Sequence, residues 1–250
     1  MQPTAQKSHV SDEKMDKKES SAYIPDYTLV IPAYNEKERI GAVLDELKSS
    51  SGRFIFIFDG DDRTPDIILD FSRRNPGIPI HVERHNKRRG KGKAILEGFR
   101  IANTPIVGFM DADGSTSIRE MERLVSEINA RDGAIGSRWL PGSRLPRKQG
   151  FSRRIQSRIF NLIIRILFGL SFKDTQCGAK VFKKSAIDAV IGDMVSSGFE
   201  FDVELLWRLS RKGYAIREVP IKWTNMSDSR VTRSDAGGML AGLLKLRIHG

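Results

Sequence analysis

The segment Ile106–Gly114 reads IVGFMDADG, an apolar run followed by two aspartates one residue apart. An apolar run of this length, ended by a turn, predicts a buried strand of a parallel sheet. Asp111 and Asp113 would then stand at the carboxyl edge of the sheet, where open α/β folds bind their ligands. Carboxylates and substrate phosphates are the usual ligands of Mg²⁺ and Mn²⁺, so this edge could hold a metal-bound diphosphate. The same pair is also typical of a solvated turn, so the flanking sequence decides between the two.

Short apolar runs alternate with helical periods along most of the chain. We expect strands over residues 27–31, 54–58, 80–83, 106–110 and 134–135, and helices over 36–48, 64–74, 91–102 and 117–130. Helices over 186–191, 199–211 and 238–248 and strands over 214–219 and 221–224 complete the pattern. The alternation predicts right-handed βαβ crossovers and an α/β fold, a mainly parallel sheet flanked by helices.

The composition favours anionic partners. The 250 residues include 42 Lys and Arg against 31 Asp and Glu, a formal net charge of +11, which suits nucleotides, lipid headgroups or nucleic acid. The lone Cys177 excludes an internal disulfide and fits a reducing cytosol. Residues 1–22 are charged and aromatic-free and predict a disordered tail, not a signal peptide. No run reaches the roughly 18 apolar residues of a transmembrane span.

An arginine-rich segment over residues 138–158 leads into a helical period over Ser152–Phe168. On a helical wheel, Arg154, Arg158 and Arg165 form a narrow basic stripe beside a wide apolar arc. This pattern is typical of a helix that lies in a membrane interface. A core helix with a solvated basic face would show the same pattern, so both interpretations stay open.

Three other strand ends carry groups suited to a nucleotide. After the first strand, Tyr34 could lie against a base, while Asn35 could cap the next helix and Glu36 would sit at its positive end. After the second strand, Asp59 could accept a hydrogen bond from a base or a ribose hydroxyl. The Gly- and Lys-rich segment 86–93 resembles an anion-binding turn but lacks the spacing of a Walker loop.

Together these strand ends resemble those of the family 2 inverting glycosyltransferases with the GT-A fold. Within that family the chain is most similar to the dolichyl- and polyprenyl-phosphate glucosyl- and mannosyltransferases. The resemblance runs from about Tyr27 to Thr224, and its most specific motifs are Val30–Glu36, Asp111–Gly114, Gly136–Arg138, Asp174–Phe182 and Phe199–Leu205. It implies a single domain over residues 23–250, with a nucleotide-binding half over about 27–136 and an acceptor half over about 137–250.

The resemblance also implies roles for individual residues. The nucleotide pocket would be lined by Pro32, Ala33, Tyr34, Glu36, Asp59, Lys93, Asp111 and Ala112. The divalent metal, Mg²⁺ or Mn²⁺, would be bound by Asp111 and Asp113, and the catalytic residues would be Asp113, Gln176 and Asp202. The acceptor phosphate would be held by Arg138, Arg144, Arg147, Arg153 and Arg154.

The chain departs from the family pattern at two positions. The second strand ends in Asp59-Gly60-Asp61-Asp62 rather than Asp-Asp-Gly-Ser, which leaves the register of Asp59 on the nucleotide open. Ser115 stands where some relatives have a metal-binding Gln, so Ser115 is left out of the expected metal ligands.

The implied activity is transfer of a hexose from UDP-glucose or GDP-mannose to a polyprenyl (dolichyl) phosphate, with inversion, by a peripheral enzyme on the cytoplasmic face of a membrane. The acceptor motifs lean toward glucose, and mannose stays open. An ionised phosphate nucleophile needs no general base. Two alternatives remain: a transferase for a glycan or other hydroxyl, with Asp202 or Glu200 as base, or a nucleic-acid-binding protein. Against nucleic acid, the basic residues adjoin an apolar helix and the strand ends are acidic.

Overall fold

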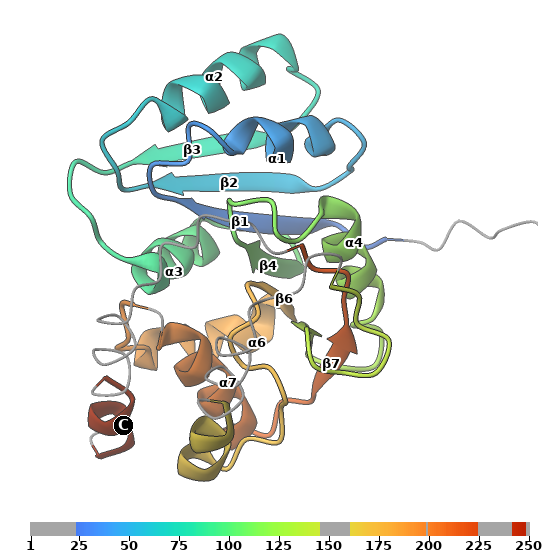
Figure 1. The fold of residues 1–250 in the computed structure, drawn as a ribbon, viewed down its shortest axis with the longest axis vertical. Helices are drawn as coiled ribbons and strands as arrows, with labels where there is room; N and C mark the ends of the chain where they lie inside the picture. The colour runs from blue at the N-terminus through green and yellow to red at the C-terminus, as the bar shows by residue number, and fades with distance from the viewer. Residues whose placement is uncertain (1–23, 146–160, 199, 225–241, 249–250) are drawn as a thin grey trace, which may run out of the picture.

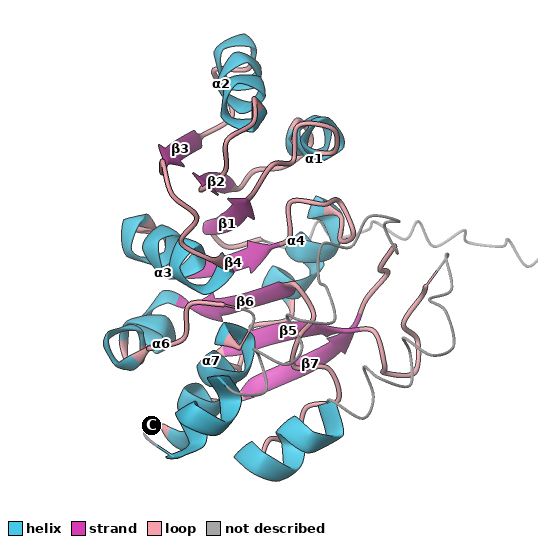
Figure 2. Ribbon diagram, turned by 60° about the vertical axis from the view of Figure 1, so that its left-hand side comes forward, coloured by secondary structure: helices cyan, strands magenta, loops and turns pink. Residues whose placement is uncertain are grey.

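The computed structural model describes residues 24–145, 161–198, 200–224 and 242–248. Within them a seven-stranded sheet runs in the order β3-β2-β1-β4-β6-β5-β7 (Figures 1 and 2). The strands are β1 (Tyr27–Ala33), β2 (Arg53–Phe58), β3 (Ile80–Arg84), β4 (Ile106–Met110), β5 (Gly133–Ser137), β6 (Ala179–Lys183) and β7 (Ile216–Pro220). The pairings β1–β2, β1–β4, β2–β3 and β5–β7 are parallel, which confirms the mainly parallel sheet.

Strand β6 runs against the other six, antiparallel to both β4 and β5. The sequence pattern did not predict it, because Lys180, the second residue of the strand, interrupts the apolar run. Lys180 is fully buried between the neighbouring strands, and its charge is met by a partner described below. The strand expected over 221–224 is wrong: there the structure has only an isolated bridge between Arg144 and Lys222.

Helices cover both faces of the sheet (Figure 2). One face packs against α1 (Ile40–Leu47), α2 (Thr64–Arg74) and α4 (Ile118–Ser126), and the other against α3 (Lys91–Ile101), α6 (Lys184–Asp188) and α7 (Phe201–Arg211). Residues 161–168 and 242–248 are also helical and join the second layer, and a 3-10 turn, η1 (Ile191–Asp193), follows α6. Alternate side chains of β1 enter opposite cores: Leu29 and Ile31 face α1, and Val30 faces α3.

Helix α1 begins at Ile40, four residues later than the sequence indicated. Residues 37–39 form a turn instead, in which the N–H groups of Arg39 and Ile40 donate to the carbonyl oxygen of Glu36. Before this turn, Asn35 has a φ of +54°, in the left-handed region. Its carboxamide oxygen accepts hydrogen bonds from the backbone N–H groups of Asp61 and Asp62, so it ties the end of β1 to the end of β2 instead of capping α1. Gly60 is required beside it, since a Cβ there would lie 2.2 Å from Asn35 Oδ1.

Several expectations fall partly or wholly outside the described residues. The tail over 1–22 lies outside them, as do Arg147, Arg153, Arg154 and Arg158. Of the amphipathic helix expected over 152–168, the described part, 161–168, is helical. Of the helix expected over 238–248, only residues 242–248 are described, and they are helical. No helix within the described ranges has the length and apolar character to cross a membrane.

Candidate active site

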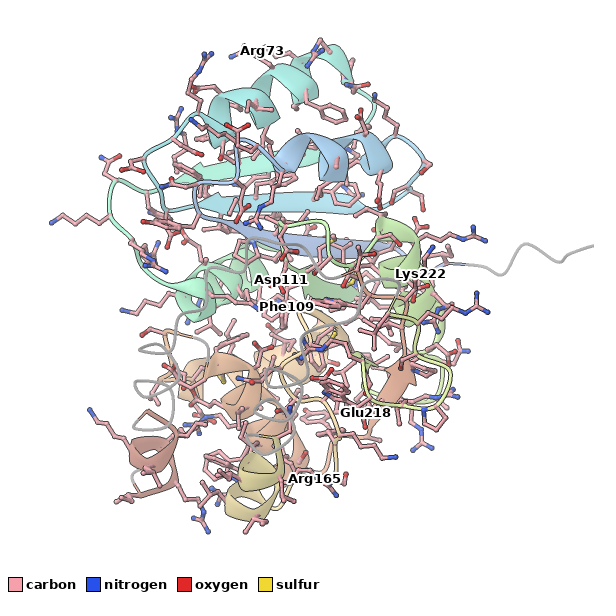
Figure 3. All side chains as sticks on the ribbon, viewed as in Figure 1. Arg73, Phe109, Asp111, Arg165, Glu218 and Lys222 are labelled. Carbon is pink, nitrogen blue, oxygen red and sulfur yellow. The ribbon has the colours of Figure 1, made fainter. Side chains whose placement is uncertain are left out.

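The topology gathers the predicted residues at one edge of the sheet. Strands β1, β2, β4 and β5 end there, just before Tyr34, Asp59, Asp111 and Arg138. Because β6 is antiparallel to β4, its start also lies at this edge and brings Gly178 beside Asp111, with Gln176 and Cys177 just before it in the chain. Helices α3 and α7 add their N-terminal residues Lys91 and Asp202. Figure 3 shows Asp111 next to Phe109 near the middle of the molecule.

Asp111 is held in place from three sides. Its backbone N–H donates to the carbonyl oxygen of Gly178 at 3.1 Å. Its carboxylate Oδ1 forms an ion pair with Lys91 Nζ at 2.8 Å, and its side chain is about one third exposed. Gly178 has to be glycine, since a Cβ there would lie 1.8 Å from Asp111 Oδ2. The start of β6 therefore cradles this carboxylate.

Asp113 stands in the turn that follows. Its Oδ1 accepts a hydrogen bond from the backbone N–H of Ser115 at 2.9 Å, and Gly114 has the positive φ of +75° that the turn demands. Ser115 itself is buried, and its carbonyl oxygen accepts from the N–H of Thr224 at 2.9 Å. Ala112 points into the core between the two aspartates. The turn is thus anchored, with its two carboxylates on either side of a buried alanine.

These two carboxylates fit a divalent cation that is shared with a phosphate-bearing ligand. Within the ranges that the structure describes, no group of three or more His, Cys, Asp or Glu side chains could hold a metal. Mg²⁺ and Mn²⁺ are commonly bound by one or two carboxylates together with substrate phosphates and water. The cradle of Gly178 and the fixed turn present such a pair without completing a metal cage.

A chain of alternating charges leads from Asp111 into the protein. Lys91 Nζ lies 2.8 Å from Asp111 Oδ1 and 3.6 Å from Asp202 Oδ2. On its other side, Asp202 Oδ1 lies 2.5 Å from Nζ of the buried Lys180, which also donates to the carbonyl oxygen of Cys177 at 2.5 Å. Both lysine ammonium groups lie over the ring of Phe109, 5.5 and 5.2 Å from its centroid. Asp202 is 2% exposed.

The charges at this edge perturb one another. Burial raises the pKa of Asp111; the Lys91 ammonium lowers it and Asp113 raises it again, so that the pKa stays above its ordinary value. Burial alone would lower the pKa of Lys91, but Asp111 and Asp202 together raise it. The lysine is therefore charged, and the aspartate is crowded by a second carboxylate. A cation at this position would relieve that crowding.

The residues expected to line a nucleotide pocket frame the same edge. The guanidinium of Arg88 lies 4.4 Å from the ring centroid of Tyr34. Asp59 Oδ2 accepts the backbone N–H groups of Arg89 and Gly90 at 2.8 and 3.0 Å, which holds the basic loop against the end of β2. Pro32 and Ala33 close β1.

Two of the expected pocket residues are placed differently from the rest. The carboxylate of Glu36 forms a two-pronged ion pair with Arg39, at 2.7 and 2.8 Å. Lys93 is exposed on α3, while Lys91 faces Asp111. The lysine that the structure brings to the site is thus two residues earlier than the one the sequence indicated.

Among the residues expected to bind the acceptor phosphate, Arg138 already has a partner within the protein. Arg138 donates Nε and Nη2 to the two carboxylate oxygens of Asp174 at 2.7 and 2.8 Å, and lies 5.4 Å from the ring centroid of Trp223. Burial raises the pKa of Asp174, but Arg138 lowers it by more, so the pKa lies below its ordinary value. Gln176 is half-buried and Arg144 is exposed. The pair therefore fixes the loop that carries Gln176.

The sequence places Lys91 and Arg88 in an anion-binding turn but assigns neither to the site, and it assigns no role to Lys180 or Gly178. For Lys91 the missing signal was the rotation of α3, which Gly92 sets: a Cβ there would lie 2.8 Å from Phe201 Cβ. Lys180 and Gly178 lie inside the Asp174–Phe182 motif, in which the family resemblance implies a role for Gln176 alone. Arg88 lies in a run of basic residues that spacing alone does not rank.

Comparison with known proteins identifies the family to which the chain belongs. The profile of glycosyl transferase family 2 matches residues 28–191. Over 217 residues the chain is 30% identical to glycosyltransferase AglD of Haloferax volcanii, covering 82% of this chain but only 34% of that protein. It is 29% identical over 222 residues to the dolichyl-phosphate beta-glucosyltransferase of Dictyostelium discoideum, covering 82% and 68% of the two chains. It is 30% identical over 206 residues to the polyprenol monophosphomannose synthase of Mycolicibacterium smegmatis, covering 78% and 76%.

Solved structures share the fold. The mannosyltransferase PcManGT of Pyrobaculum calidifontis, in complex with GDP-Man and Mn²⁺, superposes with a TM-score of 0.64 at 17% identity, over 91% of this chain and 65% of that one. The glucosyl-3-phosphoglycerate synthase of Mycobacterium tuberculosis, in complex with Mn²⁺, UDP and phosphoglyceric acid, gives 0.68 at 16% identity, over 90% and 79%. The fold is therefore the GT-A fold, and the chain belongs to glycosyl transferase family 2 and is a glycosyltransferase.

Proposed function

We propose that this enzyme transfers a hexose from a nucleotide sugar, UDP-glucose or GDP-mannose, to a polyprenyl (dolichyl) phosphate with inversion at the anomeric carbon. The proposal places the enzyme at the cytoplasmic face of a membrane as a peripheral protein. Its support comes from relatives named as dolichyl-phosphate glucosyltransferases and a polyprenol monophosphomannose synthase, and from the observation that follows.

The observation that carries the proposal is that both candidate bases, Asp202 and Glu200, already bind other groups of the protein. Asp202 is buried and faces the ammonium groups of Lys91 and Lys180. Glu200 Oε1 accepts the backbone N–H groups of Ser197 and Gly198 at 3.3 and 3.1 Å. A hydroxyl acceptor would need one of them to take a proton, whereas an ionised phosphate oxygen attacks without a base. The geometry thus favours a phosphate acceptor.

In the proposed reaction, an oxygen of the acceptor phosphate forms a bond to the anomeric carbon from one side. The bond from that carbon to the donor diphosphate breaks on the other side, and the nucleoside diphosphate leaves with its electron pair. Asp111 and Asp113 would hold a divalent cation, which neutralises charge on the leaving diphosphate when bound. Asp59 holds the basic loop, and the Arg138–Asp174 pair holds the loop that carries Gln176, the residue that would approach the donor sugar. The protein's work is positioning and charge stabilisation.

The surface of the second helical layer suits a lipid acceptor. Leu162 and Ile166 are 52% and 74% exposed on helix 161–168, and Leu244 and Ile248 are 45% and 75% exposed on helix 242–248. Arg247 Nε donates to the carbonyl oxygen of Leu167 at 3.0 Å, so the two helices lie side by side. Apolar residues mixed with cations form a surface that can rest on anionic lipid.

The deciding experiment offers one radiolabelled donor at a time, UDP-glucose or GDP-mannose, with Mg²⁺ or Mn²⁺. Each reaction contains either a polyprenyl phosphate in detergent or a mixture of soluble glycans. We expect label in the organic phase, as an acid-labile lipid-linked sugar, for one donor only. Label in the soluble glycans alone would overturn the lipid acceptor and favour a hydroxyl acceptor. A chelator should abolish transfer, and undiminished transfer in its presence would overturn the metal dependence.

A further inference from the structure

The position of Lys91 between two carboxylates has no counterpart in the roles assigned above. Its Nζ contacts Asp111 Oδ1 at 2.8 Å and lies 3.6 Å from Asp202 Oδ2. The lysine side chain is 16% exposed, and Asp202 is 3% exposed at its side chain. The ammonium therefore already places a positive charge against the carboxylate that would bind a metal, and a second carboxylate lies 3.6 Å away.

The surrounding charges make this arrangement sensitive to a cation. The cluster has three carboxylates, Asp111, Asp113 and Asp202, against two ammonium groups, Lys91 and Lys180. A divalent cation at Asp111 and Asp113 would change a cluster of net charge −1 into one of +1, which attracts a diphosphate. With the metal in place, Lys91 would face a carboxylate whose charge is already shared.

We propose that Lys91 takes the place of the divalent cation at Asp111 when the site is empty, and moves toward Asp202 when metal and donor bind. This inference rests on the proposed metal-dependent function. Asp202 then serves as the acceptor that keeps the displaced ammonium paired, so no buried charge is left alone. Lys180 and the ring of Phe109 hold Asp202 and Lys91 in register. Lys91 is a positioning residue for the metal site, and Asp202 is its counter-ion.

The proposed role is specific to Lys91 and is not shared by the neighbouring lysine on α3. Lys93, two residues further along α3, is exposed. Gly92 allows the close approach of α3 to the loop before α7: its N–H donates to the carbonyl oxygen of Ser197 at 3.0 Å. The rotation fixed by that contact turns Lys91 toward Asp111. Lys93→Met is therefore a matched control with the same change of side chain on the same helix.

The test measures Mn²⁺ binding without nucleotide, from the electron paramagnetic resonance signal of free Mn²⁺. Lys91→Met removes the competing ammonium and should bind Mn²⁺ at least about tenfold more tightly than the wild type, a shift of about 1.4 kcal/mol. Lys91→Arg, which keeps the charge, and Lys93→Met should both bind as the wild type does. Equal or weaker binding by Lys91→Met would overturn the proposal.

A second measurement covers the case in which Lys91→Met does not fold. Crystal structures of the wild type, metal-free and with Mn²⁺ and UDP or GDP, should show Nζ nearer to Asp111 in the first and nearer to Asp202 in the second. Nζ within hydrogen-bond distance of Asp111 in both would overturn the proposal. A wild type that binds no Mn²⁺ even with nucleotide would instead contradict the proposed metal-dependent function.

Discussion

At the residue scale, the ion pair between Arg138 and Asp174 carries the largest single stability effect that we expect. The Asp174 side chain is fully buried and Arg138 is 15% exposed. Asp174→Asn would leave the guanidinium buried without its counter-charge, which costs about 3–5 kcal/mol in comparable pairs. Urea unfolding at pH 7 measures the loss. Asp193→Asn, which breaks the exposed pair with Lys212, is the control and should change the free energy of unfolding by under about 1 kcal/mol.

The same ion pair makes the stability of the folded protein depend on pH. The pKa of Asp174 is lower in the folded protein than its ordinary value, because Arg138 favours the carboxylate. The folded state therefore binds fewer protons there than the unfolded state, and the stabilisation is lost as pH falls through the folded pKa. We expect the stability gap between wild type and Asp174→Asn to be constant above about pH 5 and to narrow below pH 4. A gap that widens on acidification would contradict this account.

Asp113 tests the metal site one residue at a time. Asp113→Ala removes one of the two carboxylates proposed to hold the cation, and we expect sugar transfer to fall below detection. The melting temperature should stay within a few degrees of the wild type, because Asp113 lies in a half-exposed turn. Asp45→Ala, at an exposed aspartate on α1, should transfer normally. Near-normal transfer by Asp113→Ala with metal present would remove Asp113 from the site.

At the scale of elements, the start of β6 is where sequence and structure differ most. The strands and helices before Gly136 follow from apolar periodicity, because each buries one regular face. Strand β6 does not, since Lys180, its second residue, interrupts the apolar pattern, and the Asp202 carboxylate that pairs with it comes from α7, further along the chain. Likewise, the sequence predicts a turn with Lys91, Gly92 and Lys93 at the sheet edge. It does not predict the rotation of α3, which turns Lys91 rather than Lys93 toward Asp111. Both depend on contacts between segments far apart in the chain.

Gly178→Ala tests that element directly. The added Cβ would lie 1.8 Å from Asp111 Oδ2, so the carboxylate must move while the strand pairing stays. We expect transfer to fall about 100-fold, the usual result of a displacement near 1 Å at a reacting centre, with a small change in melting temperature. Gly41→Ala in α1, with no atom within 4 Å of its added Cβ, should retain full activity. A Gly178→Ala enzyme as active as Gly41→Ala would show that Asp111 needs no fixed position.

At the scale of the whole molecule, we assign the lipid acceptor and the nucleotide to different ends of the structure. The helices 161–168 and 242–248 lie at the opposite end from α2: Figure 3 shows Arg165 and Arg73 at the two extremes. The site edge lies between them, with Asp111 near the middle. A lipid-bound acceptor would therefore approach from the Arg165 end, while the nucleotide would be held by the sheet ends of β1 and β2.

That division predicts where the enzyme touches a membrane. Ile166→Glu replaces a 74% exposed isoleucine with a carboxylate on the proposed lipid-facing surface. It should weaken binding to anionic vesicles about tenfold or more, since burying one isoleucine stabilises by about 1.5–3 kcal/mol. Ile101→Glu, at the 38% exposed end of α3, is the control and should bind vesicles as the wild type does. Vesicle co-sedimentation at several salt concentrations measures both, and wild-type binding should weaken as salt screens the net charge of +11. If Ile166→Glu sediments like the wild type while Ile101→Glu does not, the membrane contact lies on the α3 side instead.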